Sequence, residues 1–270
     1  LMDQAVYGNS SLKSAIDIAI YDILAQAKGV PLYKYLGATD KKDLVTDYTV
    51  SFNSVEEMVK QAQWIQEQGF RIIKVKIGGD PYEDIDRVKS IREVLNPDIP
   101  LRLDANQGWD VDGALLVLNS LEDCNIELCE EPILRGQYVD LKLIKDNSPI
   151  PIMADETCSD HLDAKHLVSM GACDSINIKL GKSSGICKAL KIIDIAEFAE
   201  MPLQIGGFLE SRLGFTASAH LAMCSDLING IDFDTPLMFS DDPVEGGIEY
   251  SEGGKINLPE TPGLGASLNL

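Results

Sequence analysis

Lysines and acidic residues recur in this sequence at one regular interval, each at the end of a short apolar run. The charged ends are Lys76, Asp104, Glu130, Asp155 and Lys179, which fall 28, 26, 25 and 24 positions apart. Carboxylates bind divalent cations, and a neutral lysine can take up a proton. If these side chains converge, they would form a divalent-metal site with a base on either side.

The interval itself predicts how the chain folds, because it matches one strand, one helix and two loops. Eight strands with helices between them permit closure into a (β/α)7β TIM-like barrel, an α/β fold whose strand ends form one rim where catalytic groups collect. A doubly wound open sheet is the alternative, but it places its site at one switch point, whereas polar residues end nearly every apolar run here. The predicted strands lie near residues 44–52, 71–77, 100–104, 126–130, 151–154, 174–179, 202–205 and 230–233, and the predicted helices near 10–28, 54–69, 81–95, 111–121, 137–145, 161–169, 184–199 and 213–224.

We expect the chain to divide at residue 240. Residues 1–240 would form the catalytic barrel with a lead-in helix at 10–28, which Ser10 and Ser11 could cap and whose wide apolar face predicts burial on both sides. Residues 241–270 are rich in Gly and Pro and would pack back on the barrel. A polar start that runs straight into a helix suggests that an amino-terminal α+β capping domain is absent, and the tail could pack there instead.

Composition excludes some partners. The chain has 270 residues, 45% of them hydrophobic, and a formal net charge of −20, which argues against nucleic acid and anionic membranes as partners. Its six cysteines show no metal-binding spacing, so we expect free thiols in a reduced, cytoplasmic compartment.

The three acidic residues Asp104, Glu130 and Asp155 favour a metal site only as a group. A single acid at a strand end is more often a helix cap or a loop residue. Carboxylates about 4 Å apart repel by roughly 4 kcal/mol per pair at an effective dielectric of 20, so a cluster of three needs a cation. Oxygen ligands favour Mg²⁺, with Mn²⁺ possible, over Zn²⁺. Asn106 could orient a ligand, and Glu156, like Glu131, would support the site from a face that points away.

The lysines have simpler interpretations too. Lys74 and Lys76 project from one face of a strand, which usually means a solvated edge, but a sheet buried on both faces would require partners for them. Lys74 together with a divalent cation would favour the neutral form of Lys76 that a base requires. Lys179 could be a solvated lysine at a strand exit, since Gly181 and Lys182 suggest an exposed loop.

Two further acidic positions could bind a substrate. Asp232 and Asp234 lie two apart at the end of the last predicted strand, where paired carboxylates would bind an ammonium group. The alternative is a polar turn before Pro236. Glu210 precedes a helix, so it is either an acid at the helix N-terminus or a support for the substrate or Lys179.

Five motifs in this order resemble the enolase superfamily, and most closely its muconate-lactonizing subgroup. The resemblance spans nearly the whole chain and rests on Lys-x-Lys at 74–76, Asp-Ala-Asn-Gln-Gly-Trp at 104–109, Glu-Glu-Pro at 130–132, Ala-Asp-Glu at 154–156, Asn-Ile-Lys at 177–179 and the tail 259–265. It implies that Asp104, Glu130 and Asp155 hold Mg²⁺. It also implies that Lys76 and Lys179 exchange a proton on opposite faces of a carbon next to a carboxylate, through an enediolate.

Within the superfamily, Asp-x-Asp at 232–234 resembles the dipeptide epimerases, where it binds the free amino terminus of the substrate. The resemblance thus implies a dipeptide-binding, homo-oligomeric isomerase. The alternatives are o-succinylbenzoate synthase, N-succinylamino acid racemase or a cycloisomerase, whose substrates lack a free ammonium, and a non-catalytic barrel that binds a small molecule. Gln204, at a position where a cation would suit an acidic residue, favours neutral or apolar dipeptides over Ala-Glu.

Overall fold

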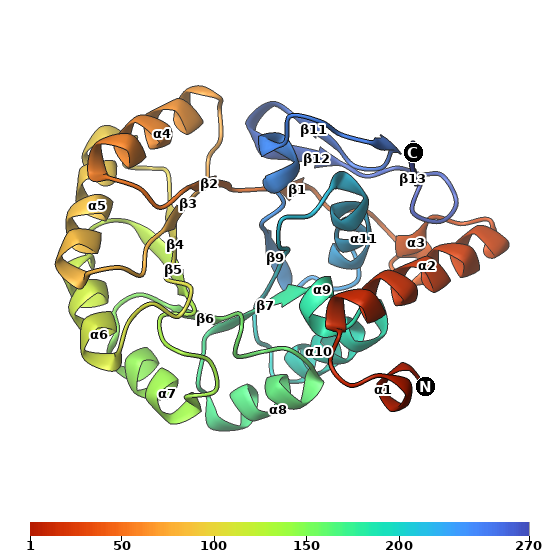
Figure 1. The fold of residues 1–270 in the computed structure, drawn as a ribbon, viewed down its shortest axis with the longest axis horizontal. Helices are drawn as coiled ribbons and strands as arrows, with labels where there is room; N and C mark the ends of the chain where they lie inside the picture. The colour runs from red at the N-terminus through yellow and green to blue at the C-terminus, as the bar shows by residue number, and fades with distance from the viewer. Residues whose placement is uncertain (270) are drawn as a thin grey trace.

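The computed structural model describes residues 1–269 and is organised around an eight-stranded parallel sheet that curves into a ring (Figure 1). The spatial order of the strands follows the chain: β2 (Tyr48–Val50), β3 (Ile73–Lys76), β4 (Leu101–Asp104), β5 (Ile126–Glu130), β6 (Ile152–Ala154), β7 (Ser175–Lys179), β8 (Leu203–Gly206) and β9 (Ile228–Ile231). A parallel bridge between Thr46, just before β2, and Ile231 brings the two edges of the sheet together. The predicted TIM-like barrel is confirmed.

Helices follow the strands and cover the outside of the ring (Figure 1). They are α4 (Val55–Glu67), α5 (Pro81–Val94), α6 (Val111–Ser120), α7 (Tyr138–Asn147), α8 (His161–Met170), α9 (Leu180–Ser183), α10 (Ile186–Phe198) and α11 (Arg212–Ala222). Short polar side chains cap the N-termini of several of these helices. The Ser54 side chain accepts from the backbone N–H of Glu57, and the Asp80 side chain accepts from that of Tyr82. Because the strands are buried on both faces over most of their length, with exposed residues at Glu127 of β5 and Asn229 of β9, the apolar runs need no alternation.

The lead-in contains α1 (Met2–Ala5), α2 (Ser10–Lys28) and α3 (Leu32–Tyr35). The predicted bounds of α2 hold, and Gly29 ends it with a positive φ of 71°. Two expectations for this helix are wrong. Asn9, not a serine, occupies the N-cap position, and the apolar face is not covered on both sides. Its exposed apolar residues are Leu12, Ile16, Ile20, Ile23 and Leu24, at 42–64% exposure.

The tail forms short strands that pack against the lead-in and the last helix. These are β10 (Val244–Gly246), β11 (Glu249–Ser251), β12 (Lys255–Asn257) and β13 (Ala266–Leu268), with the 3-10 turn η2 (Glu252–Gly254) between β11 and β12. A further 3-10 turn, η1 (Thr235–Met238), lies just before the tail. The predicted strand at 44–52 is in fact two, because β1 (Leu44–Val45) pairs with β12 of the tail before the chain enters the barrel at β2. Arg212 fixes the tail through the carbonyls of Gly246 and Ile248.

Two bulk properties accompany this fold. Within residues 1–269 no helix is long and apolar enough to cross a membrane. All six cysteines are free thiols in the described structure. The cytoplasmic location stays a prediction.

Candidate active site

Strand register sets charged residues side by side at one end of the barrel. In the pairing of β3 with β4, Lys76 is opposite Asp104, and in the pairing of β4 with β5, Asp104 is opposite Glu130. Asp155 follows β6 directly, and Lys179 is the last residue of β7. All five side chains therefore start from the carboxyl-end rim of the sheet.

Lys74 lies one layer below this rim and joins three carboxylates. Its ammonium is 2.9 Å from an oxygen of Asp104, 2.9 Å from Glu130 and 2.7 Å from Asp232. Burial alone would lower the pKa of Lys74, but the negative charges of Asp104 and Asp232 outweigh it and hold that pKa well above its ordinary value. Lys74 is therefore a buried cation that offsets the repulsion among the acids around it.

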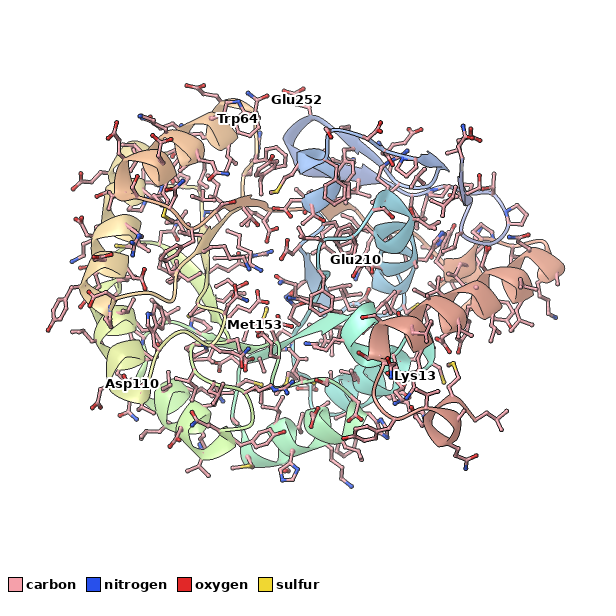
Figure 2. The ribbon with its side chains drawn as sticks, viewed as in Figure 1. Lys13, Trp64, Asp110, Met153, Glu210 and Glu252 are labelled. Carbon is pink, nitrogen blue, oxygen red and sulfur yellow. The ribbon has the colours of Figure 1, made fainter. Side chains whose placement is uncertain are left out.

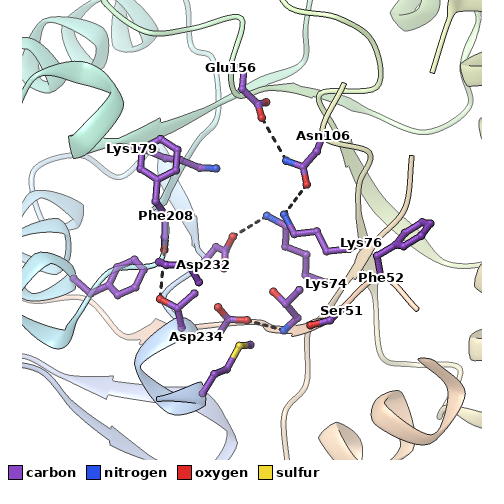
Figure 3. Close-up of a pocket in the computed structure, with 16 residues that line it drawn as sticks. Ser51, Phe52, Lys74, Lys76, Asn106, Glu156, Lys179, Phe208, Asp232 and Asp234 are labelled. Carbon is purple, nitrogen blue, oxygen red and sulfur yellow. Dashed lines mark hydrogen bonds and ion pairs between the residues drawn. The ribbon is translucent and has the colours of Figure 1, made fainter. Parts of the chain in front are cut away.

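Lys76 reaches further into the opening. Its side chain is 31% exposed, and its ammonium lies 2.6 Å from Asp104 Oδ2. The ammonium also lies 2.9 Å from Asn106 Oδ1 (Figure 3). Asn106 also donates to Glu156 Oε1 at 3.4 Å. Glu156 thus faces the opening, contrary to the expectation that it points away, and its buried Oε2 has no hydrogen-bond partner among the described side chains and backbone. Asn106 orients both the lysine and the glutamate.

Asp155 is held between two lysines. Lys179 Nζ lies 2.5 Å from its Oδ2, and Lys182 Nζ lies 2.6 Å from its Oδ1 and also contacts its carbonyl oxygen. Burial raises the pKa of Asp155, but the two ammonium groups overcome this effect and lower the pKa to about 2. The sequence placed Lys182 in an exposed loop, which is wrong: its side chain is 7% exposed.

Glu131 supports this end of the site from behind, as expected of a residue that points away. Its carboxylate accepts from the backbone N–H of Asp155 at 2.7 Å and from that of Thr157 at 3.2 Å, and it also accepts from the Thr157 hydroxyl. Glu131 itself has a positive φ of 40°, which turns the chain directly after β5. The turn after β6 is therefore fixed by a buried acid that does not enter the opening.

The donor set of Asp104, Glu130 and Asp155 suits a divalent cation. All three carboxylates are at most 1% exposed, and neighbouring pairs share an ammonium: Lys74 between the first two and Lys179, at 3.8 Å and 2.5 Å, between the last two. With these lysines between them, the ligand atoms do not all lie within 4.8 Å of one another. Binding one ion to all three therefore requires the ammonium groups to move aside. Oxygen-only donors at a buried rim fit Mg²⁺.

Asp232 and Asp234 lie directly beyond β9, on the loop that completes the ring. Asp232 binds Lys74, and Asp234 Oδ2 accepts from the backbone N–H of Thr49 at 2.7 Å (Figure 3). The residue between them, Phe233, donates its N–H to Thr46 Oγ1 at 2.8 Å and packs against Phe215, with ring centroids 4.7 Å apart and ring planes tilted by 32°. Asp234 is thus fixed to β2 and Asp232 to Lys74 of β3, and both residues line the opening.

A cavity of about 620 Å³ lies at the barrel mouth, and its charged and amide lining residues are Lys74, Lys76, Asn106, Glu156, Lys179, Asp232 and Asp234. The carboxylates of Asp104, Glu130 and Asp155 do not line it, but they contact the lysines that do. β3 and β7 are four places apart in a ring of eight strands, so Lys76 and Lys179 face each other across the cavity (Figure 3). Asp232 and Asp234 form another side. The remaining wall is largely apolar, with Phe52, Phe208, Leu209, Phe215 and Met238.

Two predicted residues lie elsewhere. Glu210 does not line this cavity: it accepts from the backbone N–H of Phe208 at 3.3 Å and faces an adjacent groove beside α11, outside the ring of strands (Figure 2). Gln204 lies one layer below the rim, fully buried, where its Oε1 accepts from Arg102 at 3.2 Å. Neither residue lines the cavity, and a role for Glu210 in supporting the substrate stays a prediction.

Comparison with known families and proteins identifies the fold and its lineage. Residues 57–270 match the family model "Enolase C-terminal domain-like", and residues 1–37 match "Mandelate racemase / muconate lactonizing enzyme, N-terminal domain". The chain belongs to this branch of the enolase superfamily. The second match covers the lead-in helices α1, α2 and α3, and the division of the chain at residue 240 stays a prediction.

Relatives of the chain are isomerases. It is 54% identical to a D-Ala-D/L-Ala epimerase of Cytophaga hutchinsonii over 98% of this chain and 72% of that protein, and 42% identical to an L-Ala-D/L-Glu epimerase of Clostridium acetobutylicum over 98% of this chain and 74% of that protein. Among solved structures, a Cytophaga hutchinsonii dipeptide epimerase complexed with Mg and D-Ala-L-Val superimposes with a TM-score of 0.98 at 53% identity, covering 99% of this chain and 73% of that one. The protein is an isomerase of this family.

Proposed function

We propose that the protein epimerises dipeptides by 1,1-proton transfer at the carbon α to the terminal carboxylate. The observation that carries this proposal is the pair Lys76 and Lys179 on opposite walls of one cavity, with buried carboxylates between them. A two-base inversion needs one amine on each face of the reacting carbon, one neutral and one protonated. The relatedness to dipeptide epimerases supports the same substrate class.

Asp104, Glu130 and Asp155 would hold Mg²⁺, with Mn²⁺ as a possible substitute. The bound cation would supply positive charge that stabilises the negative charge developing on the substrate carboxylate as the α-proton leaves. Asn106 and Glu156 would keep Lys76 directed at the reacting carbon. Lys74, already a buried cation, would add to the positive charge near the carboxylate oxygens.

The remaining acidic pair would fix the register of the peptide. Asp232 and Asp234 would bind the free ammonium of the first residue, which holds the α-carbon of the second residue between the two lysines. Substrates of a succinylbenzoate synthase, an N-succinylamino acid racemase or a cycloisomerase carry no such ammonium. This pair therefore favours the epimerase over those alternatives, and the two opposed lysines favour an enzyme over a binding barrel.

The apolar wall of the cavity favours neutral or apolar dipeptides. Phe52, Phe208, Leu209 and Met238 line it, and each of its lysines already contacts an acidic or amide side chain. Within residues 1–269, no arginine lines the cavity to bind an acidic second residue. The expected preference for neutral or apolar dipeptides thus rests on the apolar wall that includes Phe208, and not on Gln204.

The direct test is incubation of the protein with a dipeptide library in D₂O and Mg²⁺, followed by NMR of each α-position. We expect deuterium at the α-carbon of the second residue, with both diastereomers appearing, and faster exchange in apolar dipeptides than in Ala-Glu. Absence of deuterium from every dipeptide would refute the proposed function. Exchange confined to N-succinylated amino acids would instead support the racemase alternative.

A further inference from the structure

A third buried carboxylate lies beneath Asp232 and Asp234. Within the described chain, Asp47 and these two residues are the one group of three acidic side chains whose ligand atoms all lie within 4.8 Å of one another. Asp47 belongs to the segment that leads into β2, is fully buried and does not line the cavity. It therefore cannot touch a substrate, but it lies close to both residues that would.

The charges around this group do not balance. Asp47 Oδ2 accepts from Arg102 Nη1 at 3.0 Å, but Arg102 is shared with Glu127, which it binds at 2.9 and 3.1 Å. Asp232 shares its lysine with two further carboxylates, and Asp234 Oδ2 accepts from a backbone N–H. Asp47 Oδ1 is buried and lacks a hydrogen-bond partner in the part of the chain described.

We propose that Asp47 is a positioning and specificity residue of the amino-terminus site, which with Asp232 and Asp234 selects dipeptides with a free ammonium over N-acylated substrates. This inference rests on the proposed epimerase function. Lys74 and Arg102 face this group, but both are shared with carboxylates outside it, so the two cations do not neutralise three carboxylates so close together and the group retains a proton in the free protein. An incoming ammonium replaces that proton, which passes to the solvent buffer, whereas a neutral amide cannot.

The surroundings of Asp47 support a retained proton. The charged groups that face it are Lys74 from β3, Arg102 from β4, and Asp232 and Asp234 from the loop after β9. Burial and the charge of Asp232 raise the pKa of Asp47 well above its usual range, and burial and Asp232 raise the pKa of Asp234 to about 6. Lys74 and Arg102 together do not neutralise Asp47, Asp232 and Asp234, so the three carboxylates favour binding of a further positive charge.

Hydrogen bonds connect the segment that contains Asp47 to the loop that carries Asp232 and Asp234. Phe233 N–H donates to Thr46 Oγ1 at 2.8 Å, and Thr49 N–H donates to Asp234 Oδ2 at 2.7 Å, so hydrogen bonds on both sides of Asp47 fix the segment to the loop. A change in the charge of Asp47 therefore alters the field at Asp232 and Asp234 without the cavity wall changing.

The test compares Asp47→Asn with Glu127→Gln, since both substitutions remove a carboxylate that binds Arg102 but only the first lies against the acidic pair. For a dipeptide that the protein epimerises, we expect Asp47→Asn to raise KM roughly tenfold or more with kcat changed less than about threefold, because a charge facing an ammonium is lost. The inhibition constant of the N-acetyl derivative should stay unchanged. Glu127→Gln should alter neither constant more than about twofold.

Three results would overturn the inference: an unchanged KM in folded Asp47→Asn protein, an equal loss of affinity for the dipeptide and its N-acetyl derivative, or the same effect in Glu127→Gln. Absence of α-deuterium exchange by the wild-type protein would instead refute the proposed epimerase function. Failure of the Asp47 inference is therefore distinguishable from failure of the proposed function.

A second measurement needs no variant. Calorimetric titration of the wild type near pH 6.5, in buffers of different ionisation enthalpy, should show about one proton released per dipeptide bound and none for the N-acetyl derivative. Equal proton counts for the two ligands would overturn the inference.

Discussion

Lys182 Nζ lies 2.6 Å from Asp155 Oδ1, while Lys179 Nζ lies 2.5 Å from the other oxygen of the same carboxylate. Lys182 also donates to the carbonyl of Asn177 at 2.9 Å, so one ammonium ties the turn after β6 to β7. The two lysines are three residues apart, on the end of β7 and the short helix α9. Lys182 therefore fixes the oxygen that Lys179 does not contact.

Replacement of Lys182 by Met should destabilise the protein by about 2 kcal/mol. Removing one partner of a buried ion pair costs about 3–5 kcal/mol, and Asp155 retains Lys179, so part of that cost is spared. Urea unfolding followed by circular dichroism would measure the change. The matched control is Lys188→Met, which removes a lysine that binds exposed Asp3 at 2.9 Å and should cost less than about 0.5 kcal/mol. Equal effects in both variants would show that the Asp155 contact contributes nothing.

Replacement of either opposed lysine by Ala should abolish epimerisation. Loss of a general acid or base typically lowers the rate by about 10²–10⁴-fold, and inversion needs both. Deuterium exchange on a single diastereomer should survive in Lys76→Ala and in Lys179→Ala, on opposite diastereomers, as NMR in D₂O would show. Lys60→Ala, which removes an exposed lysine of α4, is the control and should leave turnover intact. Full turnover in both active-site variants would exclude the two-base scheme.

The fold and the rim residues were accessible from sequence because strand length and charge position repeat together. A charged residue that ends an apolar run marks the strand end, and parallel register then aligns Lys76 with Asp104 and Asp104 with Glu130. Gln204 was assigned to the correct strand but the wrong layer, since Gly206, two residues on, is the position in register with Lys179. A period of two gives the face of a strand but not the depth at which a side chain lies.

Other features depend on contacts that no local pattern encodes. Lys182 reaches Asp155 because α9 folds back against β7, and no periodicity in four residues predicts that. Asp47 alternates with Thr49 on the inward face, a signal that was available, but its nearness to Asp232 depends on closure of the ring between the first and last strands. Helix periodicity likewise identified the apolar face of α2 but not whether another element covers it.

Mg²⁺ should raise the melting temperature of the protein, and EDTA should reverse the effect. A ligand that binds only the folded state stabilises it by about 2.7 kcal/mol at 100 times its dissociation constant. Glu130→Gln should remove most of this shift, because the amide carries no charge and would replace the central ligand of the three. Glu127→Gln, on the same strand, should keep it. A Mg²⁺-dependent shift that persists in Glu130→Gln, or none in the wild type, would contradict the assigned ligands.

His220 should make the stability of the protein fall in mild acid, independently of the active site. It is fully buried, its Nδ1 accepts from the backbone N–H of Tyr33 at 3.1 Å, and its Nε2 lies 3.1 Å from the carbonyl of Leu264, so the neutral ring joins α3, α11 and the tail.

Burial lowers the pKa of His220 from 6.5 to about 4. The unfolded chain then binds a proton at His220 more readily than the folded chain does. The contribution of the neutral ring to the free energy of unfolding is therefore complete above pH 6.5 and is lost as the pH falls through about 4. The difference of two and a half pKa units corresponds to about 3 kcal/mol.

Urea unfolding at pH 7.5, 5.5 and 4.5 would measure this loss. His220→Asn should be less stable than the wild type at pH 7.5, because it leaves a cavity and loses a contact, but it should show a shallower decline toward pH 4.5. His166→Asn on α8, where the ring stacks on Tyr138 near the surface, should decline as steeply as the wild type. Parallel pH curves for the wild type and His220→Asn would place the acid sensitivity elsewhere in the fold.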